Sequence, residues 1–127
     1  MINNSVDVEE INIRKIARQL LKELGFKVHY LGFKYWISAI EITVDIDKSN
    51  KKICMMELYE LIAKKYRTTN LRVEKDMRYL HKERNVDVRS FFNVNYSVSS
   101  SALLFLLVEE VKNRVDEICL KTCETYV

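Results

Sequence analysis

The chain has 127 residues and a net charge of +3, with 48% hydrophobic and 31% charged residues. This is the balance of a globular protein with a core large enough to fold alone. It contains no proline and only two glycines, Gly25 and Gly32. Because sheet-rich folds of this size need more turn residues, the composition favours helices and argues against a β-sandwich or barrel.

Two further features indicate where the protein acts. Met1 is followed by polar and acidic residues instead of an apolar signal region, and the longest apolar run, residues 102–108, is too short to span a membrane. The cysteines are odd in number, which is typical of a reducing compartment, and we expect inert thiols there. The expected location is therefore cytoplasmic. These cysteines are Cys54, Cys119 and Cys123.

Residues 1–10 are expected to form a flexible tail, and residues 11–127 a single domain. An apolar stripe at helical spacing predicts a first helix, which Gly25 is placed to terminate. The stripe consists of Ile13, Ile16, Ala17, Leu20, Leu21 and Leu24.

Residues 33–46 are ambiguous. β-Branched side chains are frequent there, and apolar and polar residues alternate from Ile40 to Ile46, so local propensity favours a strand. An isolated strand, however, would have no evident partner to pair with. Trp36, in the same segment, is interpreted as a core or helix-docking aromatic.

Residues 58–83 carry the strongest functional signal, because they read as two short helices joined by a tight turn. Apolar residues at helical spacing predict a helix from Leu58 to Tyr66, in which Ala63 provides the small side chain that a close helix crossing needs. A polar break at residues 67–69 follows, and Thr69 or Asn70 can cap a second helix. The first-helix residues are Leu58, Leu61, Ile62 and Tyr66.

The second helix is expected to bury Val73, Met77 and Leu80, which recur at intervals of four and three. Its opposite face is rich in cations, as suits a DNA groove, although basic helix faces are more often merely solvated. The excess of positive charge is local: residues 59–84 hold eight Lys and Arg against four Asp and Glu, so they carry +4 and the remainder −1. The exposed face holds Leu71, Arg72, Lys75, Arg78, Tyr79 and Lys82.

The C-terminal part predicts a short helix near residues 88–92 and a strong helix over residues 102–120. A heptad-like seam in the latter is expected to pack on its own domain. The competing interpretation is a dimer helix, with extra apolar surface from Leu103, Phe105, Leu106 and Leu107. The seam consists of Leu104, Val108, Val111, Val115 and Ile118.

The segment over residues 58–83 resembles the DNA-binding effector domain of stage zero sporulation protein A, the sporulation response regulator. The resemblance is carried by Ile62 to Tyr66, by Thr68 and Thr69, and by Arg72 to Lys75 with Arg78. Weaker similarity covers most of the chain. The resemblance implies an all-α fold of about six helices with a helix-turn-helix, and therefore a helix over residues 33–46 with Phe33, Ile37, Ile40 and Val44 facing inward.

The resemblance also implies roles for individual residues. Arg72 and Lys75 match basic positions that contact bases or phosphates, Glu74 matches an acidic position between them, and Thr68 and Thr69 match the turn beside the DNA backbone. Lys75 stands where the family has arginine, and lysine lacks the fork that pairs with guanine. The predicted DNA-binding set is Thr68, Thr69, Leu71, Arg72, Glu74, Lys75, Arg78, Tyr79 and Lys82.

No catalytic motif, metal-ligand cluster or cofactor-binding loop is present in the pattern, so an enzyme is not expected. The favoured function is a sequence-specific regulator of transcription that binds double-stranded DNA. A homodimer through the C-terminal helix and a contact with RNA polymerase are further candidate interactions. The alternative is a protein-interaction module that keeps the fold and binds another regulator or a polymerase subunit through that helix. The family places this domain behind a receiver domain, which is not expected here.

Overall fold

A computed structural model describes the backbone of residues 4–84 and 86–125, and the side chains of residues 13–84 and 86–120. Its regular structure is entirely helical, and no strand occurs in these described residues. This confirms the all-α prediction. In chain order the helices are α1 (Asn4–Glu23), α2 (Leu31–Lys48), α3 (Met55–Tyr66), α4 (Asn70–Lys82), α5 (Val88–Phe92) and α6 (Ser100–Thr125).

Helix α1 buries the predicted stripe: Ile13, Ala17, Leu20, Leu21 and Leu24 lie in the core. It ends in a Schellman motif, in which the Phe26 amide donates to the Leu21 carbonyl at 3.0 Å and Gly25 adopts a φ of 81°. The tail predicted over residues 1–10 stays a prediction, because residues 1–3 and the side chains before Ile13 lie outside the described part. The backbone is described as helical from Asn4.

The ambiguous segment forms α2, the central helix of the fold. Phe33, Ile37, Ile40 and Val44 face the core as predicted, and Trp36 is completely buried beside them. Helix α2 packs against α1, α3, α4 and α6. Because it has neighbours on several sides, its β-branched side chains are buried by helices, and this burial outweighs their local preference for a strand.

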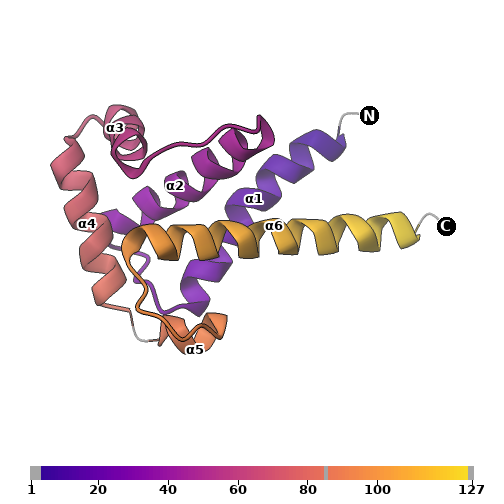
Figure 1. Ribbon diagram of the computed structural model, residues 1–127. Coiled ribbons are helices and arrows are strands. Elements are labelled where there is room, and N and C mark those ends of the chain that lie inside the picture. The colour runs from indigo at the N-terminus through magenta and orange to yellow at the C-terminus, as the bar shows by residue number, and fades with distance from the viewer. Residues whose placement is uncertain (1–3, 85, 126–127) are drawn as a thin grey trace.

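The helices divide the molecule into two ends. Helices α3 and α4 lie at one end, while the start of α1 and the end of α6 point toward the other (Figure 1). Helix α5 lies below the start of α6 in the same view. The helix-turn-helix segment is thus remote from the start of α1 and the end of α6.

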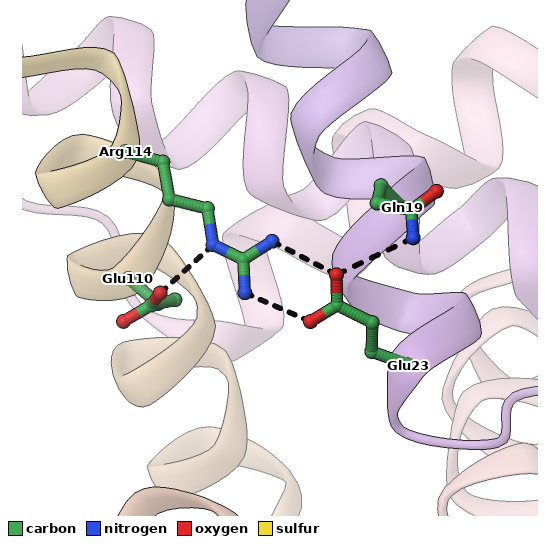
Figure 2. Close-up of polar contacts among 4 residues, drawn as sticks. All are labelled: Gln19, Glu23, Glu110 and Arg114. Carbon is green, nitrogen blue, oxygen red and sulfur yellow. Dashed lines mark hydrogen bonds and ion pairs between the residues drawn. The ribbon is translucent and has the colours of Figure 1, made fainter. Parts of the chain in front are cut away.

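Helices α1 and α6 are joined by a group of polar side chains (Figure 2). Arg114 makes a bidentate contact with Glu23, with its Nη2 and Nη1 at 2.9 and 3.3 Å from the two carboxylate oxygens. Its Nε donates to Glu110 at 2.8 Å, and Gln19 donates to Glu23 at 3.3 Å. The Arg114 hydrogen bonds lower the pKa of Glu23 below its ordinary value. The paired charges hold the first and last helices in register.

The burial of the C-terminal helix shows that part of the predicted dimer surface was wrong. Leu104, Val108 and Val111 are buried in the domain, as the favoured interpretation of the seam requires, but Leu103 and Leu107 are completely buried as well. These two leucines therefore cannot supply surface to a dimer. The core-facing stripe of α6 is wider than a coiled-coil seam, because the helix rests on both α1 and α2. Ile118, at the end of the seam, is 40% exposed.

Candidate nucleic-acid interface

Helix α3 begins three residues before the predicted start. Cys54 is its N-cap, and the Glu57 carboxylate accepts a hydrogen bond of 3.3 Å from the Cys54 amide, which forms a capping box with an unusual cysteine. Leu58, Ile62 and Ala63 are buried as predicted, whereas Leu61 is 43% exposed and does not belong to the core face. Leu61 lies one residue outside the buried stripe.

The turn between α3 and α4 is made without glycine. Arg67 adopts a left-handed conformation, with φ of 53° and ψ of 51°, and the Thr68 amide donates to the Ala63 carbonyl at 2.9 Å. Thr69 then caps α4 by accepting a hydrogen bond of 3.2 Å from the Arg72 amide. This agrees with one of the two predicted caps.

The inner face of α4 is held tightly. Val73, Met77 and Leu80 are completely buried, as predicted. The indole of buried Trp36 donates a hydrogen bond to the Met77 carbonyl. Sequence reasoning assigned Trp36 to the core but did not find this partner, because a side-chain bond to a helix carbonyl leaves no pattern in the sequence.

Helix α2 approaches α4 closely at Gly32. A Cβ at this position would lie 2.5 Å from the Asp76 carbonyl oxygen and 3.3 Å from the Leu80 Cβ. Glycine is thus required because the backbone of α4 occupies the space that a side chain would need. The requirement is steric, since Gly32 lies within a helix.

The outer face of α4 presents the side chains that were predicted to contact DNA. Arg72, Lys75, Arg78 and Lys82 are exposed, and so are the non-cationic Leu71 at 75% and Tyr79 at 51%. Thr69 is exposed at the turn, whereas Thr68 and Glu74 are half-buried. The structure therefore brings all nine predicted side chains to one helix and the turn before it.

The cations on this face are not equivalent. Arg78 Nη1 lies 3.4 Å from the Glu74 carboxylate one turn earlier, so its charge is partly offset. Arg72, Lys75 and Lys82 have no carboxylate within ion-pair distance in the part of the chain that the structure describes. These three charges are available to an anionic partner.

An aromatic contact between Tyr30 and Tyr79 borders the outer face of α4. The rings of Tyr30 and Tyr79 lie 5.8 Å apart, and the Lys27 ammonium lies 5.7 Å from the Tyr30 ring. The neighbouring Glu83 carboxylate, followed by Tyr30, raises the pKa of the Tyr79 hydroxyl, which stays protonated. Tyr30 and Lys27 lie in the connector before α2, where the sequence carried no motif.

His81 is a buried polar residue that sequence reasoning left without a role. Its Nε2 lies 3.0 Å from the Val98 carbonyl, and its Nδ1 lies 3.0 Å from Arg84 Nη1. Since a carbonyl only accepts and an arginine only donates, the ring is neutral with its proton on Nε2. His81 thereby ties the end of α4 to the segment that precedes α6.

Neither a metal site nor a membrane span is found in the described residues. No group of three or more His, Cys, Asp and Glu side chains that could hold a metal occurs among them. No helix in the same described part is long and apolar enough to cross a bilayer. Cys54 and Cys119 are free and exposed, and the Cys123 side chain lies outside the described residues.

Taken with the burial of its inner face, the geometry of α3, the turn and α4 defines an all-helical fold with a helix-turn-helix. The chain belongs to the family described as Sporulation initiation factor Spo0A C terminal, whose model matches residues 17–100. The match ends where α6 begins. This is a family of DNA-binding domains and not of catalysts. No solved structure matches the chain.

Proposed function

We propose that this protein is a sequence-specific regulator of transcription, located in the cytoplasm, that places α4 in the major groove of double-stranded DNA. One observation carries the proposal: α4 exposes three cations that have no carboxylate within ion-pair distance among the described residues, and its opposite face is completely buried. Because the buried side fixes the helix, the exposed side is presented in one orientation. Membership of the family supports the same function.

Each predicted contact has a role within this proposal. Arg72 stands in the first turn of α4, where groove-reading residues lie, and is the candidate for a guanine contact. Lys82 stands in the last turn and is the candidate for a phosphate contact. Leu71 is suited to a thymine methyl group. Lys75, Arg78 and Tyr79 complete the surface, with Glu74 orienting Arg78.

The test measures fluorescence anisotropy of labelled duplexes across a salt series, after selection of bound sequences from a random pool. Arg72→Ala should cost about 1–3 kcal/mol on the selected duplex and relax its base preference. Lys82→Ala should weaken binding to all duplexes equally and reduce the salt slope by about one. Lys22→Ala, which removes an exposed cation from α1, is the matched control. Wild-type protein that binds no duplex at low salt would contradict the proposal.

A second function has one specific observation in its favour. Phe105 is 63% exposed on α6, and Ile118 and Leu120 are 40% and 63% exposed further along the same helix. Such residues suit a partner helix, either from a second copy of this chain or from RNA polymerase. Phe105→Ser should abolish dimerisation in sedimentation experiments while the melting temperature stays unchanged. A wild type that remains monomeric and still binds DNA tightly would argue against the dimer.

A further inference from the structure

A second cationic group lies beside the turn of the helix-turn-helix, formed by α2 and the end of α3. The Lys34 ammonium lies 4.8 Å from the centre of the Tyr66 ring, and the Lys65 ammonium lies 5.4 Å from it. Both lysines are exposed, while the tyrosine between them is half-buried. We call these three residues the Tyr66 cluster.

A pair of hydrogen-bonded hydroxyl groups adjoins Lys65. The buried Ser38 Oγ lies 2.8 Å from the Tyr66 hydroxyl, and Lys65 Nζ donates to the same Ser38 oxygen at 3.3 Å. Lys65 is thereby held near the ring instead of extending freely into solvent. The exposed Lys34 and Lys65 ammonium groups supply the positive charge that binds a phosphate oxygen, and the buried Ser38 hydroxyl helps to hold Lys65 in place.

The cations of the cluster lack an anion of their own. Neither Lys34 nor Lys65 has a carboxylate within ion-pair distance among the described residues. Two like charges beside one ring repel each other, and the Tyr66 ring offsets only part of this repulsion. A bound anion would remove the remainder, so the arrangement favours an anionic ligand.

The cluster is continuous with the face of α4. The Tyr35 ring lies 5.3 Å from the Tyr66 ring, on the side of α2 that packs against α4. Tyr35 lies three residues after Gly32 and next to Trp36, and both of these residues contact α4, so Tyr35 is on the side of α2 that faces α4. Tyr35 thus connects the cluster to α4, the helix that contains Arg72.

We infer that the Tyr66 cluster binds a backbone phosphate of DNA, at the edge of the groove that α4 enters. This inference rests on the proposed function and adds to it a second contact that fixes the register of the protein on the duplex. A phosphate held by Lys34 and Lys65 would orient the first turn of α4, so the contact affects affinity for all sequences and base preference only indirectly.

The experiment compares wild type with the double variant Lys34→Met and Lys65→Met on a duplex selected from a random pool. The variant should bind about ten-fold more weakly. Its salt slope should fall by about 0.9 for the one phosphate lost. Single phosphates of the duplex are then replaced by neutral methylphosphonates. One replacement should weaken wild-type binding but leave the variant unaffected.

The matched control is Lys15→Met with Lys22→Met, which removes two exposed charges from α1. An equal loss in control and variant would mean a general effect of net charge and would overturn the inference, as would a variant with the affinity and slope of wild type. The paired change to arginine, Lys34→Arg and Lys65→Arg, should retain the slope. If the wild type binds no duplex at all, the proposed function itself is wrong. If the wild type binds but the variant and the control do not differ, only the phosphate contact is wrong.

Discussion

The indole Nε1 of Trp36 donates a hydrogen bond of 3.0 Å to the carbonyl oxygen of Met77. The bond joins the second turn of α2 to the middle of α4, and both side chains are completely buried. The position of the exposed cations therefore depends on a polar contact inside the core. A single buried bond of this kind restricts how α4 can rotate and slide on α2.

Replacing Trp36 by phenylalanine removes the donor and leaves a small void. We expect the free energy of unfolding to fall by about 1–3 kcal/mol, since a hydrogen bond and some packing are lost together. Urea unfolding measures the change. Tyr96→Phe, at a tyrosine that is 48% exposed, is the control and should leave the stability unchanged. An unaltered midpoint in the tryptophan variant would show that the bond contributes nothing net.

Replacing Gly32 by alanine tests the close approach of α2 and α4. In most helix interiors this change is stabilising by up to about 1 kcal/mol. Here we expect a loss of roughly 1–3 kcal/mol, because the added Cβ would overlap the backbone of Asp76. DNA affinity should fall as well, since α4 must move.

Gly25→Ala provides the comparison for Gly32→Ala. It should also be destabilising, by about 1–2 kcal/mol, because φ is 81° at this position. Gly25 lies at the end of α1, so DNA affinity should be retained at temperatures where the variant is folded. If both variants bind DNA as the wild type does, the close contact at Gly32 is not needed for DNA binding by α4.

Arg67→Gly should stabilise the protein by about 0.5–1 kcal/mol. Arg67 adopts a left-handed conformation at the end of α3, a position where glycine avoids the steric cost of a Cβ. Asn93, with φ of 56° at the end of α5, is the control, because asparagine tolerates this conformation and gains less from the same change. A lower melting temperature for Arg67→Gly would mean that its side chain supports the turn.

Stability should decrease as the pH falls below about 6.5 because of His81. Burial lowers the pKa of His81 from its ordinary 6.5, the hydrogen bond to Val98 opposes this, and the Arg84 charge lowers it further. The unfolded chain then binds more protons than the folded one. The stability due to neutral His81 is thus complete above pH 6.5 and is lost as the pH falls toward the folded pKa.

Urea titrations from about pH 7.5 to about pH 5 test this dependence. His81→Gln should have a flatter profile, whereas His29→Gln, which alters the exposed histidine, should keep the wild-type profile. Glu23 does not interfere, because its pKa is lowered from 4.5 and its contribution is lost only at more acidic pH. If the His81 variant has the same dependence of stability on pH as the wild type, another group is responsible for that dependence.

Helix periodicity predicted most of the fold, because each buried stripe has the same spacing in the sequence as on the helix. The buried stripe of α1 and the inner face of α4 were identified in this way. For residues 33–46 local propensity favoured a strand, and the helix was inferred from the resemblance and from the lack of a partner strand. Burial against four other helices then determined the outcome.

The candidate site was less predictable than the fold. The exposed cations of α4 follow from periodicity, but the contacts that position them do not. Gly32 against Asp76 and Trp36 against Met77 each join residues far apart in the sequence, and a single sequence carries no trace of such a pair. For the same reason periodicity alone left open the dimer interpretation, in which Leu103 and Leu107 supply surface, although both are completely buried.

The pairing of α1 with α6 has a consequence for how the protein is synthesised. Glu23 and Arg114 are 91 residues apart, so α1 leaves the ribosome long before its partner. At about 5–20 residues per second, the 26 residues of α6 alone require roughly 1–5 s. During this interval the helix-turn-helix segment has already been synthesised, while the apolar side of α1 is not yet packed against α6. Chaperones that recognise exposed apolar segments would meet this intermediate rather than the finished protein.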